Sequence, residues 1–249
     1  MNRLNLYDVE GNKLNLHAIG LIGNKLTVPS PSYSIVSESL DDGGIIVLEK
    51  HLDSRSLTAE FMTKATNYNE TLKQKYELFS LIGNGKEFYI EQTNRPGIVW
   101  KCHLDGWTPE HIGTRVTTFS IPLTCMSGLS ESINLNKKKY SSTSFNFKND
   151  GNQLIVMTKQ NETEITFKGA STNLTITNNT TGEVWMYTGS TIDSDIIKLK
   201  GVQSFKNDSS IFGQTNKKLL SFAVGNNEFT VSGASGVFEL TISTRFYFL

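Results

Sequence analysis

The sequence lacks the features that would indicate nucleic-acid binding, secretion or a membrane span. Its 249 residues contain 24 Lys and Arg against 24 Asp and Glu, so the formal net charge is zero. Nucleic-acid binding depends on a surplus of basic side chains that neutralise phosphates, and this balance argues against it. Residues 1–9 show no basic stretch followed by an apolar run, and no segment approaches the roughly 18 apolar residues of a membrane span. We therefore expect no secretion signal and no membrane insertion.

Cysteine and histidine are scarce. Cys102 and Cys125 are the only cysteines. They could be buried small apolar residues or a disulfide pair, and folding in a reducing cytosol favours the first interpretation. His103 and His111 lie close in sequence to Cys102 and Asp105, but their spacing matches no established metal site. We expect no metal and no cofactor.

Catalytic motifs are missing from the sequence as well. Neither a Gly-x-Ser-x-Gly elbow nor a His-Glu-x-x-His zinc helix occurs. We therefore expect no enzymatic activity. A cell-wall hydrolase remains an alternative, in which Glu91 and Asp105 would have to approach each other as a carboxylate pair.

The composition changes near residue 140, which indicates two domains. All five prolines and all four histidines precede this point, and ten of the fourteen phenylalanines follow it. The polar, basic segment around Lys137 has no sustained apolar period. We therefore predict an N-terminal domain over 1–135, a linker over 136–143 and a C-terminal domain over 144–249.

The first domain is predicted to be α+β, with one main helix packed on a sheet. Asn67 can cap this helix, with Glu70 in the capping-box position and Gly83-Asn84-Gly85 at its end. Four apolar residues recur at spacings of four, three and three, which predicts a single buried helix face: Leu72, Tyr76, Phe79 and Ile82. Strands are predicted around the helix, including one over 56–62. Another alternates from Phe119 to Cys125 and carries Pro122, which predicts an edge strand or a bulge.

The second domain reads as an antiparallel β-sandwich, so the chain as a whole is mainly β. Short apolar runs alternate with turn residues at the pace of such a fold. The closing segment is the clearest, because one parity is apolar: Phe238, Leu240, Ile242, Phe246 and Phe248. This period of two predicts a strand with one buried face.

Two groups of residues are candidates for binding. The segment from Tyr33 to Leu57 is predicted to reach a neighbouring subunit, because its apolar run needs cover and its tip suits an exposed loop. The predicted interface residues are Asp41, Asp42, Ile45, Ile46, Val47 and Leu48. Trp185 and Tyr187 share one face of a strand and could stack on a sugar ring, although aromatic side chains commonly pack inside a sandwich or against a subunit instead.

The sequence resembles the distal tail proteins (Dit) of siphophages that infect Gram-positive bacteria. In the second domain the resemblance rests on four segments: residues 165–185 (from Ile-Thr-Phe-Lys-Gly-Ala to Gly-Glu-Val-Trp), 215–220, 225–229 and the closing run 238–249. In the first domain it rests on the order of an N-terminal hairpin, a Gly-Gly loop, a strand over 56–62, a helix after Asn67 and a strand ending at Cys125.

This resemblance implies a structural protein of the virion, located at the tail tip and made in the host cytoplasm. It implies an N-terminal domain that assembles six copies into a ring, and a C-terminal domain with a galectin-like sandwich. The ring would join the tail tube to the baseplate and let DNA pass through its lumen. Its partners would be the tail tube protein, the tape-measure protein, baseplate proteins and a receptor-binding protein. The alternative function is a carbohydrate-binding module for host cell-wall polysaccharide.

Overall fold

The chain divides into two compact units. The computed structural model describes residues 3–63, 65, 67–107, 117–160 and 162–249. The first unit runs to Ile133 and includes Leu249, and the second extends from Asn134 to Phe248. Strands dominate both units, and the predicted mainly β fold class is confirmed.

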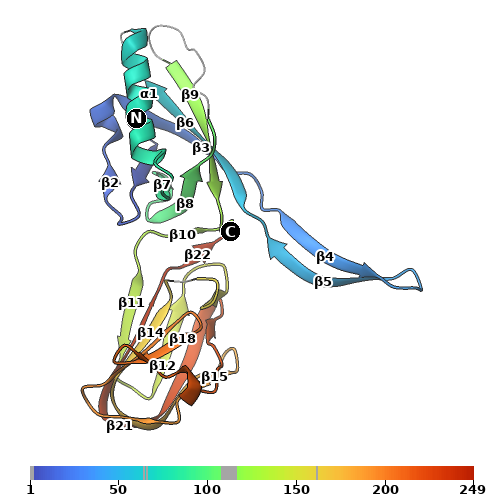
Figure 1. The fold of residues 1–249 in the computed structure, drawn as a ribbon, viewed down its shortest axis with the longest axis vertical. Coiled ribbons are helices and arrows are strands. Elements are labelled where there is room, and N and C mark those ends of the chain that lie inside the picture. Colours follow the sequence, from blue (N-terminus) through green and yellow to red (C-terminus); the bar gives the residue numbers. More distant parts are fainter. Residues whose placement is uncertain (1–2, 64, 66, 108–116, 161) are drawn as a thin grey trace. The chain divides into compact units, whose positions relative to one another are not determined.

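The first unit holds one α-helix beside an antiparallel sheet (Figure 1). Its helices are the 3-10 helix Leu16–Ile19 and α1 (Tyr68–Ile82). Its strands are β1 (Leu4–Tyr7), β2 (Lys13–Leu14), β3 (Leu21–Thr27), β4 (Tyr33–Ser39), β5 (Ile45–Leu52), β6 (Arg55–Thr63), β7 (Phe88–Gln92), β8 (Ile98–Leu104), β9 (Thr117–Cys125) and β10 (Ser130–Ser132).

The main sheet of the first unit curls around its own core. Its strands follow the order β2-β1-β7-β8-β9-β6-β3, and β10 pairs with β8. The N–H of Arg3, next to β1, donates to the carbonyl oxygen of Gly23 in β3 at 2.8 Å, so the two ends of this path approach each other. Alternate side chains fill the enclosed space, including the fully buried Leu6, Phe61 and Ile90.

Helix α1 begins where the sequence predicts, but a different face is buried. The Asn67 side chain accepts a hydrogen bond from the N–H of Glu70 at 3.0 Å, as expected of an N-cap. The predicted face is wrong in part, because Tyr76 is 67% exposed and only Ile82 of the predicted set is fully buried. The buried face consists of Thr71, Gln74, Lys75, Leu78 and Ile82. Three of these five residues are polar, and one of them, Gln74, accepts a hydrogen bond from the Thr63 hydroxyl inside the unit.

Pro122 lies in an internal strand rather than at an edge. β9 pairs with β6 along its whole length and with β8 only at Leu123 and Thr124. The carbonyl oxygen of Pro122 accepts from the N–H of Asp105, just after β8 ends. Proline has no N–H to donate toward β8, but the pairing of β8 and β9 already ends at this position. The proline therefore costs the sheet few hydrogen bonds.

Two long strands organise the second unit. Its strands are β11 (Asn136–Tyr140), β12 (Ser144–Asn149), β13 (Ile155–Val156), β14 (Glu164–Asn178), β15 (Glu183–Met186), β16 (Ser190–Thr191), β17 (Ile196–Lys200), β18 (Gln203–Lys206), β19 (Ser209–Ser210), β20 (Ser221–Phe222), β21 (Gly225–Thr244) and β22 (Tyr247–Phe248), with a 3-10 helix at Phe212–Gln214. β14 and β21 pair along most of their length, with β11 and β12 on the other side of β21 and β15, β16 and β17 on the other side of β14.

Glycine lets these two long strands bend. The register between β14 and β21 shifts at 168–170 and at 171–175. Gly169 and Gly233 lie at or next to these shifts with φ of +149° and +80°. A Cβ on Gly233 would lie 2.5 Å from the carbonyl oxygen of Thr172, so only glycine fits there. Each strand thus pairs with one set of neighbours before the bend and another after it.

The segment predicted as a linker is instead largely a strand. Residues 136–140 form β11 and pair with β21 from Thr244 to Leu240. The linker over 136–143 is therefore wrong for these residues, because their backbone groups join the sheet of the second unit. Lys137, Lys138 and Lys139 are exposed on this end strand. Charged lysines on an edge strand oppose pairing with foreign chains, which gives this basic run a structural role.

The predicted apolar side of the closing strand is buried up to Ile242, although Thr241 on the other side is buried as well. Phe238, Leu240 and Ile242 are buried, at 6%, 0% and 0% exposure. β21 ends at Thr244, and beyond it Phe246 and Tyr247 are both buried. The alternation of apolar and polar side chains ends where the strand ends. The predicted alternation through Phe248 therefore does not continue.

Candidate functional site

A two-stranded hairpin extends from the first unit. β4 and β5 pair only with each other among the described strands and point away from the main sheet and α1 (Figure 1). The tip is a tight turn in which the N–H of Leu40 donates to the carbonyl oxygen of Gly44 at 2.7 Å. The Asp42 carboxylate accepts from the N–H of Gly44 at 3.0 Å, and Gly43 adopts a positive φ of 84°. Asp41 and Asp42 thus lie at the exposed tip, where the sequence placed them.

The register gives this hairpin one apolar face. Opposite residues of antiparallel strands point to the same side. One side carries the opposed pairs Tyr33 with Leu52, Ile35 with Lys50, Ser37 with Val47 and Ser39 with Ile45. We call Tyr33, Ile35, Ile45 and Val47 the apolar face. Their exposed fractions are 40%, 56%, 71% and 58%.

The remaining predicted interface residues lie elsewhere on the hairpin. Ile46 pairs with Glu38 and points to the other side, which also carries Glu49 and His51. Leu48 falls in a bulge, where the register shifts between Val36 and Ser37, and it is 55% exposed. Tyr33 and Ile35 belong to the predicted segment but were not among the predicted interface residues, although their spacing of two in β4 was a visible signal.

An exposed apolar surface of this kind needs a physical explanation. Single exposed apolar residues are ordinary, but contiguous ones on a projecting strand pair indicate a contact surface. An isolated two-stranded hairpin is at best marginally stable in water. Here Lys50 covers only the ring of Tyr33, at 4.2 Å from its centroid. The hairpin is therefore the candidate functional site of the first unit.

The predicted sugar-stacking residues are not available to a sugar. Trp185 and Tyr187 do share one side of their segment, but they are only 2% and 3% exposed. The indole N–H of Trp185 lies 3.3 Å from the hydroxyl of Ser204 and donates to it. This prediction is wrong, because the second unit uses both aromatic rings as core.

The groups considered for catalysis and metal binding do not converge. Glu91 accepts hydrogen bonds at 2.7 Å from Asn5, Tyr7 and the N–H of Gly97, while Asp105 accepts from Thr124. His103 lies 3.6 Å from Asp105, and His111 is outside the described residues. Within the described part of the chain, no three His, Cys, Asp or Glu side chains gather as metal ligands.

The Glu91 cluster is a structural feature that the sequence did not reveal. Burial by itself raises the pKa of Glu91, but hydrogen bonds from Asn5, Gly97 and Tyr7 outweigh it and hold the pKa below its usual value. Burial, followed by the contact with Glu91, raises the pKa of Tyr7 to about 12. The hydrogen bonds of this cluster link β1 to β7 and to the turn before β8. The cluster therefore stabilises the main sheet of the first unit and does not form a reactive pair.

Comparison with known proteins places this geometry in a family. The phage tail protein RIFT-related domain family matches residues 11–125, which include the hairpin and every strand from β2 to β9. The SPP1 Dit protein, described as a paradigm of the hub adsorption apparatus in phages infecting Gram-positive bacteria, has a similar fold. The TM-score is 0.73 at 12% identity, covering 98% of this chain and 99% of that one.

Residues 11–125 match this phage tail protein domain family, and the chain as a whole shares the fold of the SPP1 Dit protein. The predicted resemblance is thereby confirmed, through the family match in the first unit and the shared fold over both units. Two structures of the phage P2 baseplate in its activated conformation, with Ca and with Sr, align at TM-scores of 0.46 and 0.45 and 11% and 10% identity, each covering 98% of both chains. None of the curated proteins matches this chain.

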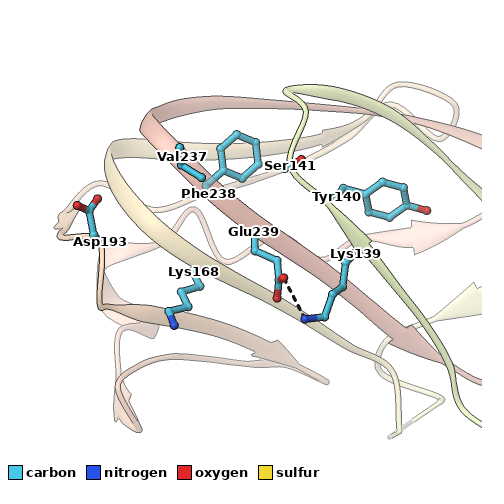
Figure 2. Close-up of a pocket in the computed structure, with 8 residues that line it drawn as sticks. All are labelled: Lys139, Tyr140, Ser141, Lys168, Asp193, Val237, Phe238 and Glu239. Atoms are coloured by element: carbon cyan, nitrogen blue, oxygen red, sulfur yellow. Dashed lines mark hydrogen bonds and ion pairs between the residues drawn. The ribbon is translucent and has the colours of Figure 1, made fainter.

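A broad surface hollow with a volume of about 590 Å³ lies in the second unit (Figure 2). It lies along β11 and β21 and is lined by Lys139, Tyr140, Ser141, Lys168, Asp193, Val237, Phe238 and Glu239. Lys139 and Glu239 pair across it at 3.0 Å. Basic and acidic groups balance in its lining, so the hollow favours no particular charge.

The described helices are short. Among the described residues, no helix combines the length and the apolar character that crossing a bilayer requires. α1, at 15 residues, carries Lys73, Lys75 and Glu77 within its middle turns.

Proposed function

We propose that this chain forms a closed ring at the tip of a phage tail, joining the tail tube to the baseplate. The ring contains six copies, and DNA passes through its lumen in transit. The chain is made in the host cytoplasm and functions in the virion. Its partners are further copies of itself, the tail tube and tape-measure proteins, baseplate proteins and a receptor-binding protein.

The observation that carries this proposal is the uncovered apolar face of the hairpin. A closed ring requires head-to-tail contacts, in which one surface of each copy meets a different surface of the next. The projecting hairpin fits this requirement, because it reaches beyond its own unit. It can therefore contact a different surface on the neighbouring copy. Covering Ile35, Ile45 and Val47 would remove from water side chains that are each more than half exposed.

The charge of the chain suits a channel for DNA. A formal net charge of zero gives no general attraction for phosphates that would hold DNA inside the ring. The similar fold of the SPP1 Dit hub protein supports the same role. The alternative role in polysaccharide binding has lost its motivation, because the two aromatic side chains proposed for it are buried.

The test measures assembly of the full chain by sedimentation over a range of concentrations, followed by negative-stain imaging. The wild-type chain should yield annular particles, alone or with its tail neighbours. The double variant Ile45→Asp, Val47→Asp should remain a single chain with an unchanged circular dichroism spectrum, because charge on the apolar face opposes burial.

A matched control introduces the same charge at another exposed apolar residue. Val237→Asp alters a side chain that is 89% exposed in the second unit and should leave assembly unchanged. Rings formed equally well by the hairpin double variant would contradict the proposed contact. A wild-type chain that stays single at every concentration, even with its tail neighbours, would contradict the ring itself.

A further inference from the structure

The two cysteines of the first unit occupy directly opposed positions on neighbouring strands. β8 and β9 pair antiparallel, with His103 opposite Thr124 and Leu104 opposite Leu123. One further step of the same register sets Cys102 opposite Cys125. Opposed residues of antiparallel strands point to the same face, so both thiols lie side by side within the core.

The hydrogen-bond pattern shows which kind of opposed pair this is. The N–H of Asp105 donates to the carbonyl oxygen of Pro122, which makes 105 and 122 a hydrogen-bonded position. Hydrogen-bonded and non-hydrogen-bonded positions alternate along antiparallel strands. Counting three steps from Asp105 makes Cys102 and Cys125 a non-hydrogen-bonded pair, with Cα atoms about 4.5 Å apart. This separation falls within the range of about 4.4–6.8 Å that a disulfide spans.

The surroundings of the two thiols differ. Both cysteines are buried, at 1% and 0% exposure, and both are free thiols. The Cys125 thiol donates a hydrogen bond to the carbonyl oxygen of Leu129 at 3.4 Å, and its Sγ lies 3.4 Å from the hydroxyl of Ser127. The Cys102 thiol donates a hydrogen bond to Cys125, which lowers the pKa of Cys125 to about 6, while the same contact and burial raise the pKa of Cys102. Cys125 is therefore the better nucleophile of the pair.

A buried positive charge lies in the same row of the sheet. Arg55 on β6 is opposite Cys125 on the other side of β9 and is only 4% exposed. Its guanidinium packs over Trp100 at 5.1 Å, and its Nε and Nη2 have no hydrogen-bond partner among the described residues.

We propose that Cys102 and Cys125 form an oxidisable pair, which closes to a cross-strand disulfide when the protein meets a peroxide. Cys125 attacks one oxygen of the peroxide, becomes a sulfenic acid and releases water. Cys102 then attacks that sulfur, and the sulfenic oxygen leaves as a second water with the thiol proton. Two thiols and one hydrogen peroxide thus give one disulfide and two waters. Transient local openings of the sheet admit the small oxidant.

The disulfide would brace the base of the hairpin. β9 pairs with all of β6, and β6 begins three residues after β5 ends. A bond between β8 and β9 would fix the framework from which the arm extends. The timing rests on the proposed function: the pair would stay reduced in the cytosol of the host and oxidise after release of the virion.

The decisive measurement uses the wild-type full chain. Reduced protein is exposed to hydrogen peroxide, denatured, treated with an alkylating agent and weighed as an intact chain. We expect both alkylation sites to disappear, the mass to fall by about 2 Da relative to the reduced chain, and dithiothreitol to restore both sites. The apparent Tm should rise by a few degrees on oxidation and return on reduction.

Matched variants identify the partners. Cys102→Ala, Cys125→Ala should show no mass change and no redox-dependent Tm. The single variant Cys125→Ala should keep one alkylatable thiol under the same exposure. Three outcomes would overturn the proposal. They are two thiols that are still alkylated in the wild-type chain, a mass increase from added oxygen in place of the decrease of about 2 Da, and a disulfide between two chains. Because single chains and rings can be assayed separately, a failure of ring assembly would not be confused with a failure of oxidation.

Discussion

The hairpin β4–β5 and the long strands β14 and β21 are built from the same kind of sequence but end in different surroundings. Both are antiparallel pairs with apolar side chains at a spacing of two. In the second unit, Leu240 and Ile242 of β21 are fully buried. In the hairpin, Ile45 and Val47 remain more than half exposed within their own chain.

This difference shows that apolar alternation identifies a strand without identifying what covers it. The strands β14 and β21 are covered within the chain, so their apolar residues stabilise the fold. The hairpin has no cover within the described part of its own chain, so its apolar residues are available for association. The same contrast holds for acidic residues: Glu91 is buried with three donors, whereas Glu49 pairs with His51 in an exposed contact.

The largest effect is expected in the covered strands. Leu240→Ala removes a side chain with no exposed surface and leaves a cavity in the second unit, which should lower the free energy of unfolding by about 2–5 kcal/mol. Urea unfolding of the full chain measures this change. A decrease in the free energy of unfolding below about 0.5 kcal/mol would contradict this prediction, because it would show that Leu240 contributes as little as an exposed side chain.

An effect of intermediate size is expected when the buried carboxylate of the first unit is replaced. Glu91→Gln puts an amide group where three donors meet a carboxylate, and it should lower the free energy of unfolding by about 1–3 kcal/mol near neutral pH. Because the pKa of Glu91 is lowered in the folded chain, its contribution is present above the unfolded value and is lost as the pH falls through the folded value. The wild-type chain should therefore lose stability on acidification, and the variant should lose less.

Glu49→Gln is the matched control for that variant. The contact of Glu49 with His51 is exposed, at 62% and 57% for the two side chains, and such contacts contribute little. Unfolding measured at neutral pH and at about pH 3 should show a stability profile for Glu49→Gln that follows the wild-type chain. Equal pH profiles for Glu91→Gln and the wild type would refute the assigned role of Glu91.

The smallest effect on folding is expected in the hairpin. Val47→Ala shortens a side chain that is 58% exposed and should change the free energy of unfolding of the single chain by no more than about 0.5 kcal/mol. The same variant should weaken ring assembly, which sedimentation measures. A large loss of single-chain stability would instead mean that the hairpin is covered by its own chain in solution.

The sequence predicted those features of the fold that depend on neighbouring residues along the chain. Asn67 begins α1 as a cap because its side chain reaches an N–H only three residues away. The strand alternation of β21 and the exposed tip at Asp41 and Asp42 were likewise visible, because side-chain direction in a strand follows the backbone.

The same local signals were insufficient for the candidate site. The sequence correctly directed attention to Ile45 and Val47, but the grouping of these residues with Tyr33 and Ile35 follows from the register, including a bulge that the sequence does not mark. The polar contact of Gln74 with Thr63 lies on the buried face of α1 and depends on residues from two separate elements, while Tyr76 lies on the exposed side.

By itself, the sequence determined the start of α1, the exposed tip of the hairpin and the alternation of Phe238, Leu240 and Ile242, since capping, turns and side-chain spacing within an element are local. Only the tertiary structure decided which apolar residues are covered, because cover comes from segments distant along the chain. It buried Trp185 and Tyr187 in the second unit and left Val47 exposed in the first. It also set Cys102 opposite Cys125, since the register of β8 and β9 is fixed by packing across the whole sheet rather than by either strand alone.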